Sequence, residues 1–512
     1  MFKLPLPICI GAAFLVYRVL RFWQQLAFHG YLKGYRPLLD PHSLPGNAIP
    51  AKWWHMGFMW PWLQRKTAHF NHTYDLTTLV PLLMGKSMYV VASVDLARQI
   101  WRNEVKTHLL KPSDFTTEGV WGSSIASANG DDWKRHRRVV APAFSPNMLM
   151  RAVEESALVY KSMKTDLQSD VIITNMHALL LRSTLVMICR CGFGMDVDWK
   201  QGATNDEIAV FDRALSVASA TLIHPLIFPK WLYKLPVQSL RKIDQCWETV
   251  LTLITSLAAG RQAESSTLKE LGDDEMNDLF TKLVSSTDDA ARYSLTPAEV
   301  TGDMMSLLFA GNETTGSALM STLVFLGLHP EEQQTALEEI MRVVPSADDM
   351  TLRDVSNLKY LLACKHEAHR LVPVTINLPR DVPEDLVLRS MLPVERDIVI
   401  RKGSRVMIDV MAVCHKPHDF PDPESYNPAR WMPDVKDDVI MFGTGPRACV
   451  GRRFAQVEAV AFLAHFLRDW RVETVLLDGE TRFAALERVL EEACMFGTAF
   501  GVGEVPMKIL PR

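Results

Sequence analysis

The stretch that decides the fold of this chain is MFGTGPRACVGRRFA, Met441–Ala455. Its glycines and proline exclude a regular helix or a central strand before the cysteine, whereas the apolar periodicity of RRFAQVEAVAFLAHFL predicts a helix after it. The N-terminus of such a helix stabilises a thiolate. Gly451 would let a flat ligand approach the backbone, and Arg447 would suit a carboxylate on that ligand. Cys449 is therefore either a buried core thiol or a ligand.

The composition indicates a globular protein with a large core. The chain has 512 residues, of which 48% are hydrophobic and 22% charged, as is usual for folded proteins. The net charge is only -4, so no overall basic field points to a nucleic-acid partner. The eight cysteines include no C-x-x-C pair and lack the spacing of a disulfide scaffold. We expect a reducing compartment and no nucleic-acid binding.

The N-terminal segment differs from the rest of the chain. Residues 1–27 begin with a nearly uninterrupted apolar run, and Arg18 and Arg21 interrupt it. The excess of basic residues after the run predicts a single-pass membrane anchor with the remainder on the cytosolic side. A cleaved signal peptide is the alternative. Residues 28–50 contain four prolines and predict a stiff linker. Residues 51–512 are expected to form one large domain.

Most of that domain is predicted to be helical. Thr296, Pro297 and Glu299 form a capping-box start, followed by about thirty mostly apolar residues. At ~1.5 Å per residue this is a rod of roughly 45–50 Å, which must pass through the core. The β-branched runs Ser87–Ser93 and Ser404–Val410 read as strands. The expected fold is mainly α with a small β part and a long central helix.

Two further motifs bear on function. Ala310–Thr315, AGNETT, is poor helix chemistry for a buried rod, because glycine and threonine both weaken helices; a structural kink would also explain it. His366–Arg370, HEAHR, is not a zinc helix, because its histidines are i,i+3 rather than i,i+4. Glu367 and Arg370 share a helix face, where a surface ion pair would contribute little.

The cysteine stretch resembles a known family. Its spacing, F-x-x-G-x-R-x-C-x-G, is the haem-thiolate signature of the cytochrome P-450 family, and all five defining positions are filled, by Phe442, Gly445, Arg447, Cys449 and Gly451. The resemblance implies a haem cofactor with Cys449 as the axial thiolate ligand of its iron. It also implies that Phe442, Arg447 and Gly451 contact the haem. The fold implied is the helical domain of that family, with minor sheets.

The other motifs match the family in order along the chain. The A/G-G-x-D/E-T-T motif implies that Thr314 holds the water that protonates bound oxygen and that Glu313 belongs to the proton route. The E-x-x-R motif implies that Glu367, Arg370 and the later Arg430 form a buried structural lock.

A basic helix carries the remaining match. Trp133 and Arg137 fit the family's W-x-x-x-R, which reaches a haem propionate, and Arg380 is expected to do the same. Three more basic residues of this helix are expected to be free charges for docking an acidic electron donor, together with Arg452 and Arg453, although a solvated face is the plainer reading. These are Lys134, Arg135 and Arg138.

The activity implied is insertion of one oxygen atom from O2 into a lipophilic small molecule, by hydroxylation or epoxidation. Electrons would come from NADPH through a separate NADPH–cytochrome reductase, because the chain has no G-x-G-x-x-G unit. GPRACVGRRFA is similar to fungal members, which favours a terpenoid or other specialised metabolite, and the expected location is the endoplasmic reticulum membrane. The expected pocket walls are Phe309, Ala310, Val374, Thr375, Ile376, Met495 and Phe496.

Three alternatives stay open. A reductase-independent isomerase or dehydratase of the same family would often lack the oxygen-activating threonine, which is present here as Thr314. A non-catalytic haem protein would not need the groove at Gly311–Thr314. A haem-free helical interaction protein would leave the cysteine loop unexplained.

Overall fold

The computed structural model describes residues 6–66, 69–104, 108–113, 118–167, 170–195, 197, 199, 207–222, 224–271, 279–286, 293–346, 349–432 and 439–512. The chain divides into two compact units, each assembled from separate stretches of sequence. Unit 1 comprises Met1–Phe115, Thr375–Glu424 and Gly443–Ala448. Unit 2 comprises Thr116–Val374, Ser425–Phe442 and Cys449–Arg512. The prediction of a mainly helical fold with small sheets is confirmed.

Unit 1 is built on a five-stranded mixed sheet of order β1-β2-β3-β8-β5. The two predicted strands are neighbours at its centre, since β3 and β8 pair in parallel with Val90 opposite Met407. A separate hairpin joins β6 to β7. The strands are β1 (Gly34–Tyr35), β2 (Leu76–Leu79), β3 (Met88–Val91), β5 (Asn377–Asp381), β6 (Leu386–Ser390), β7 (Arg396–Ile400) and β8 (Arg405–Asp409). The helices are α1 (Leu6–Phe28), α2 (Leu44–Ala48), α3 (Trp60–Leu63), α4 (His69–Thr73), α5 (Val94–Asn103) and α18 (Val410–Cys414).

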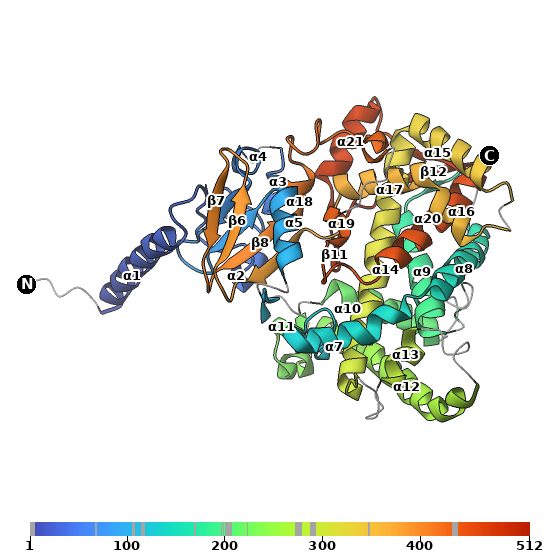
Figure 1. The fold of residues 1–512 in the computed structure, drawn as a ribbon, viewed down its shortest axis with the longest axis horizontal. Helices are drawn as coiled ribbons and strands as arrows, with labels where there is room; N and C mark the ends of the chain where they lie inside the picture. Colours follow the sequence, from blue (N-terminus) through green and yellow to red (C-terminus); the bar gives the residue numbers. More distant parts are fainter. Residues whose placement is uncertain are drawn as a thin grey trace, which may run out of the picture. The chain divides into compact units, whose positions relative to one another are not determined.

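The N-terminal helix α1 lies in unit 1 (Figure 1). Within the described part of the chain, which starts at Leu6, no helix reaches the length and apolarity that crossing a bilayer requires. Arg18 and Arg21 interrupt the apolar surface of α1 after about three turns. The prediction of a membrane-spanning helix is therefore not supported. The proline-bearing residues 28–50 contain β1 and α2, and the side chain of Ser43 caps α2.

Unit 2 is mainly helical. Its α-helices are α6 (Glu118–Trp121), α7 (Gly130–Val140), α8 (Pro146–Lys164), α9 (Met176–Met187), α10 (Glu207–Ala220), α11 (His224–Ile227), α12 (Gln238–Leu271), α13 (Leu279–Ser285), α14 (Pro297–Leu328), α15 (Pro330–Val343), α16 (Leu352–Asn357), α17 (Lys359–Leu371), α19 (Val439–Phe442), α20 (Arg452–Asp469) and α21 (Arg482–Glu491). Shorter helical turns are η2 (Ala141–Ala143), η3 (Ile188–Gly192), η5 (Lys230–Lys234) and η6 (Pro428–Trp431). Two small sheets complete the unit, β4 (Ile172–Ile173) with β12 (Met507–Pro511) and β9 (Trp470–Thr474), and the hairpin of β10 (Cys494–Phe496) and β11 (Ala499–Gly501).

Helix α14 is the long helix predicted from the sequence, and it runs through the core of unit 2 among α9, α17 and α20 (Figure 1). The capping box is confirmed, because Thr296 accepts from the backbone of Glu299 and the Glu299 carboxylate accepts from the backbone of Thr296. The helix is continuous through AGNETT. Between Gly302 and Leu326 every residue is buried except Ala310, Gly311 and Thr314. These residues are one and four positions apart, so the buried helix has an open patch on one face.

Candidate functional site

The loop before α20 holds Cys449 at the start of a helix, as predicted. The backbone N–H of Cys449 donates to the Phe442 carbonyl over 2.9 Å, and Gly451 is the N-cap residue of α20. The Cys449 thiol is exposed. Gly445 has a φ of +74°, and a Cβ there would lie 2.5 Å from the Trp101 carbonyl oxygen, so this position requires glycine. All eight cysteines lie in described ranges, and none forms a disulfide.

Unlike Gly445, Gly451 is not required by its backbone conformation. Its φ is ordinary, at -87°. A Cβ at this position would come no closer than 3.7 Å to the ring of Phe144. The protein itself therefore leaves room for a side chain here, and the glycine keeps the backbone beside Cys449 accessible. This is the space that a flat group on the thiol would need.

Phe442 is held from two sides by helix α17. The ammonium of Lys365 lies 4.8 Å from the centroid of the Phe442 ring, which is a cation–π contact. The ring of His369 packs edge-on at 6.0 Å between centroids. The two histidines of HEAHR thus pack on aromatic rings, since His366 also lies edge-on to Trp431 at 5.4 Å.

Helix α17 also carries the predicted structural lock. Glu367 accepts from Arg370 Nε over 2.9 Å and from Arg430 Nε over 3.0 Å. Trp431 Nε1 donates to the same carboxylate over 3.0 Å. Glu367 and Arg370 are completely buried. These donors compensate the charge of the buried carboxylate. The motif is therefore a buried ion-pair cluster, and not the exposed pair that sequence spacing alone would permit.

Helix α7 brings Trp133 and Arg137 to one face, four residues apart. Trp133 is buried. Burial lowers the pKa of Arg137, and the charge of Cys449 acts in the opposite direction, favouring the charged guanidinium. Arg137 and Cys449 are therefore close enough to interact electrostatically within unit 2.

Unit 1 contains a cluster of cationic side chains around Glu104. Two of its members, Arg380 and Arg447, were predicted to contact the haem. Arg380 Nε lies 2.5 Å from Glu104 Oε1, and Arg447 Nε lies 3.6 Å from the same oxygen. Burial, together with the charges of Arg380 and Arg447, lowers the pKa of Lys111 to about 7 against the opposing charge of Glu104. Burial likewise lowers the pKa of Arg447 to about 10. Three cationic side chains thus face one carboxylate, an arrangement that suits additional carboxylates.

Sequence reasoning missed Glu104 and Lys111. Lys111 stands in HLLKPSD, where a lysine after two leucines gave no recognisable motif. The available signal was weak, a lysine between two leucines and a proline. Neither residue lies near Arg380 or Arg447 in the sequence.

The open patch of α14 includes Thr314, one of the two predicted catalytic residues, while the other, Glu313, is buried beside it. The Thr314 hydroxyl donates to the Ala310 carbonyl over 2.6 Å. Gly311 packs against η3, because a Cβ there would lie 3.1 Å from Ile188 Cδ1. Glu313 is buried, and its carboxylate accepts from the backbone N–H of Thr498 over 2.8 Å and from the Thr498 hydroxyl.

The hairpin turn between β10 and β11 makes this contact with Glu313. Gly497 has a φ of +57°, and a Cβ there would lie 2.3 Å from Glu313 Oε1, so only glycine allows the close approach. Burial raises the pKa of Glu313, and the two bonds from Thr498 oppose that rise. Sequence reasoning missed Gly497 and Thr498, which are separated from Glu313 by more than 180 residues.

The expected pocket walls are apolar, and two tryptophans join them. Phe309 stacks on Trp121 at 5.2 Å between centroids and on Trp247 at 5.8 Å. Phe496 lies edge-on to His177 at 4.6 Å. Val374 packs in one cluster with residues of α14 and β11. Of the remaining walls, Ala310 and Met495 lie in unit 2, while Thr375 and Ile376 lie in unit 1.

The prediction that Lys134 and Arg135 are free charges is wrong, whereas Arg138 stays exposed on the surface of α7. Arg135 pairs with Glu299 on α14 through Nη2–Oε1 at 2.5 Å, which lowers the pKa of Glu299 to about 2. Lys134 pairs with Asp131 over 2.7 Å, and the Arg138 guanidinium lies 4.6 Å from the Tyr293 ring centroid. The acidic residues at the start of α7 and the cap of α14 therefore neutralise much of this basic run.

Comparison with known proteins assigns the family. The sequence model of the cytochrome P-450 family matches residues 45–487. Cytochrome P-450 monooxygenase 124 of Postia placenta is 26% identical, over 80% of this chain and 80% of that protein. Cytochrome P-450 4c21 of Blattella germanica is 24% identical, over 86% and 88%. Leukotriene-B4 omega-hydroxylase 3 of Mus musculus is 25% identical, over 90% and 89%.

Members of this family bind haem through a cysteine thiolate, take electrons from a redox partner and act on lipophilic substrates. The chain therefore belongs to the cytochrome P-450 family and is a haem-thiolate monooxygenase.

Proposed function

We propose that this monooxygenase inserts one oxygen atom from O2 into a C–H or C=C bond of a lipophilic small molecule, a terpenoid or other specialised metabolite. The observation that carries the proposal is the open patch of Ala310, Gly311 and Thr314 on an otherwise buried helix. An exposed thiol at the start of a neighbouring helix accompanies it, since α20 contacts α14 within unit 2. The apolar walls around Phe309 and Phe496 favour a substrate without charge.

The residues present fit a haem group. Cys449 would supply the axial thiolate, and Gly451 and Phe442 would border the ring. In unit 2, Arg137 with Trp133 would bind one of its carboxylates. Within unit 1, the cluster of Arg380, Arg447 and Lys111 is also suited to carboxylates. The bound haem would supply O2 activation, for which a thiolate ligand favours O–O cleavage.

Glu313 and Thr314 are proposed to deliver protons. A buried glutamate with a raised pKa holds a proton at higher pH than an exposed one, so Glu313 would serve as the local proton store. The Thr314 hydroxyl bonds the Ala310 carbonyl and would present an oxygen to a water molecule in the open patch. Thr498 would hold the Glu313 carboxyl group in place.

The redox partner is proposed to be an NADPH–cytochrome reductase. The chain carries no dinucleotide-binding glycine motif of its own. Because Arg135 and Lys134 are paired, the acidic surface of a donor would instead meet Arg138 and Arg453, which are exposed at α7 and α20.

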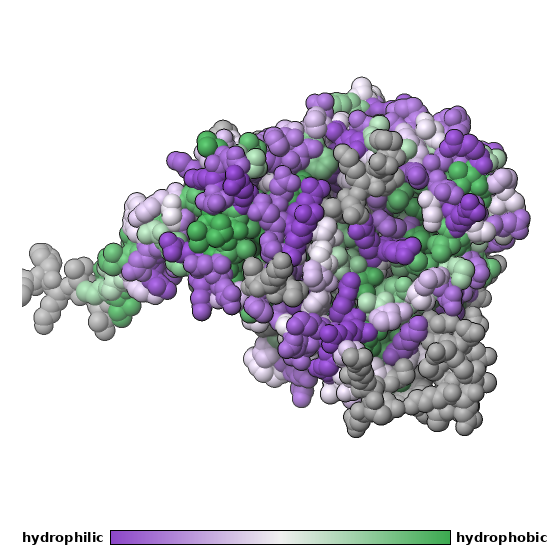
Figure 2. All heavy atoms as spheres, viewed as in Figure 1, coloured by the Kyte–Doolittle hydropathy of each residue, from purple (hydrophilic) through white to green (hydrophobic). Residues whose placement is uncertain are grey.

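We also propose that α1 attaches the protein to the cytosolic face of the endoplasmic reticulum membrane. Apolar side chains remain exposed along this helix (Figure 2), and such surfaces favour a lipid environment. They belong to Ile8, Ile10, Phe14, Leu15, Val16, Tyr17, Leu20 and Trp23. A chain lacking residues 1–27 should then lose flotation with vesicles.

A carbon monoxide difference spectrum tests the central assignment. The reduced protein should give a Soret band at about 450 nm, and Cys449→Ser should abolish it. Cys494→Ser, another exposed cysteine, should retain it. A folded Cys449→Ser protein that keeps the band would refute Cys449 as the ligand. Incorporation of isotopically labelled O2 into product, dependent on NADPH and a reductase, would then separate a monooxygenase from a reductase-independent isomerase.

A further inference from the structure

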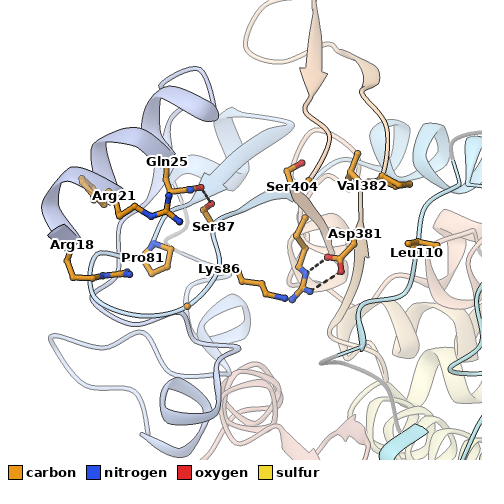
Figure 3. Close-up of a pocket in the computed structure, with 15 residues that line it drawn as sticks. Arg18, Arg21, Gln25, Pro81, Lys86, Ser87, Leu110, Asp381, Val382 and Ser404 are labelled. Carbon is orange, nitrogen blue, oxygen red and sulfur yellow. Dashed lines mark hydrogen bonds and ion pairs between the residues drawn. The ribbon is translucent and has the colours of Figure 1, made fainter. Parts of the chain in front are cut away.

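We propose that unit 1 contains a binding site for the headgroup of an anionic phospholipid, in a cavity between α1 and the mixed sheet. The inference deepens the proposed membrane attachment and rests on it. The cavity measures about 490 Å³. Arg18, Arg21 and Gln25 border it from α1, Lys86 and Ser87 from the loop between β2 and β3, and Ser404 from the edge of β8 (Figure 3).

The charge of the cavity suits a phosphate. Among its fifteen described lining residues, four are cationic and one, Asp381, is acidic. Asp381 pairs with Arg405 through Nε–Oδ1 at 2.7 Å (Figure 3). The positive charge of Arg18 and Arg21 therefore exceeds what the lining itself compensates. Guanidinium groups match phosphate oxygens in charge and geometry.

Hydrogen bonds hold α1 against the β2–β3 loop, so the cavity is preformed. The Arg18 Nε donates to the Leu82 carbonyl over 3.1 Å, which places its guanidinium beside the β2–β3 loop. The Ser87 hydroxyl donates to Gln25 Oε1 over 2.5 Å and lies 2.9 Å from His29 Nε2. These bonds fasten the C-terminal half of α1 to the loop, so a ligand would not have to order the site.

The helix face above the cavity is apolar, and this selects a lipid over a free phosphate. Arg18, Arg21 and Gln25 are spaced i, i+3 and i+7, so they share one face. The same face continues one turn toward the N-terminus at Phe14 and Leu15, which are 55% and 53% exposed. A ligand with its phosphate in the cavity would lay an apolar tail over these two side chains. Glycerol phosphate would leave them uncovered.

Flotation of the full-length holoprotein separates attachment from headgroup recognition. Binding to zwitterionic phosphatidylcholine vesicles tests attachment. Addition of phosphatidic acid should strengthen binding roughly tenfold or more. The double substitution Arg18→Glu with Arg21→Glu should remove that gain, and Arg18→Lys with Arg21→Lys should retain most of it. The control, Arg342→Glu with Arg353→Glu, changes net charge equally at exposed positions of unit 2 and should keep the gain.

Soluble ligands then test the lipid assignment. Short-chain dihexanoyl phosphatidic acid should bind more tightly than glycerol phosphate, and Phe14→Ser with Leu15→Ser should weaken only the former. Equal binding of the two ligands would make this a phosphate site and overturn the proposal. Equal flotation on both vesicle types, or a gain that survives the Arg18/Arg21 reversal, would also overturn it while leaving attachment intact. Failure to float on any vesicle would refute both.

Discussion

Two buried glutamates of unit 2, Glu367 and Glu313, are surrounded by different donors. Glu367 accepts from two guanidiniums and an indole N–H, at 2.9–3.0 Å. Glu313 accepts from the N–H and hydroxyl of Thr498, and among the described residues no cation pairs with it. Burial accordingly raises the pKa of Glu313. The comparison teaches that a buried carboxylate bonded by neutral donors, as Glu313 is by Thr498, has a raised pKa and is suited to store a proton.

Glu367→Gln should produce the largest effect on stability. It removes the carboxylate charge that faces the buried Arg370 and the partly buried Arg430, and breaking a buried ion pair in this way typically costs about 3–5 kcal/mol. We expect little folded holoprotein, measured by the yield of haem-bound protein and by thermal unfolding. Glu395→Gln is the control, because Arg389–Glu395 is an exposed pair that contributes little. Normal yield of Glu367→Gln would contradict a locking role.

Glu313→Gln should affect turnover more than stability, because no cation loses its partner. If Glu313 supplies protons, product formed per NADPH consumed should fall on the order of 10²-fold, while the carbon monoxide spectrum stays normal. Glu339→Gln is the matched control. Glu339 is buried and accepts from the N–H groups of Tyr360 and Leu361. Its substitution should lower the free energy of unfolding but leave the product formed per NADPH consumed unchanged. If Glu313→Gln forms as much product per NADPH consumed as the unmodified protein, Glu313 does not supply protons and has only a structural role.

Asp409→Asn extends the comparison to a buried carboxylate of unit 1 that likewise has no cationic partner in the part of the chain that the structure describes. Asp409 accepts from Ala412 N–H and from Asn71, and burial raises its pKa from 3.8 to about 7. Between these pH values the folded state holds a proton that the unfolded state has lost. Stability should therefore fall as pH rises from 3.8 to about 7, by at most about 1.4 kcal/mol per pH unit.

The measurement is the free energy of unfolding as a function of pH in both proteins. Asp409→Asn should flatten this slope, because asparagine cannot ionise and still caps α18. A flip of the Asn71 amide would let it accept from the new side chain. Equal slopes in the two proteins would show that Asp409 is not the titrating group.

Thr498→Val is the mildest change, since it removes one of two donors to Glu313. The lost hydroxyl bond had favoured the carboxylate, so the pKa of Glu313 should rise further. Coupled turnover that needs protonated Glu313 should then persist to higher pH, and the infrared band of the protonated carboxyl group should do the same. Thr322→Val, whose hydroxyl bonds only its own helix at Ala318, should shift neither. An unchanged pH dependence of coupled turnover in Thr498→Val would show that the β10–β11 hairpin does not influence the pKa of Glu313.

The features predicted well from sequence are those in which local chemistry and spacing coincide. Thr296 and Glu299 fix the start of α14 within four residues. The loop at Cys449 and the Glu367–Arg370 pair are likewise short motifs. Arg430 could be added because the resemblance supplied it, although it lies 63 residues from Glu367. The role of each site residue remains a prediction.

The features missed depend on contacts between distant segments. Thr498 stands in FGTAFG, which carries no motif, and only the folded hairpin brings it to Glu313. Arg135 looked exposed because the sequence could not show that Glu299 would reach it. The apolar run of residues 1–27 predicted a spanning helix although Arg18 and Arg21 interrupt it, and with these two charges α1 does not reach the apolarity that crossing a bilayer requires.

The central pairing of unit 1 has a consequence for synthesis at the ribosome. Strand β3 ends at Val91, yet its parallel partner β8 begins at Arg405. One edge of β3 must therefore wait for more than three hundred residues to be translated, which at ~5–20 residues per second takes roughly a minute or less. During that interval an apolar strand edge is available for wrong pairing. The β2–β3 hairpin, which is local, is its first protection, and chaperone demand should concentrate on the nascent N-terminal hundred residues.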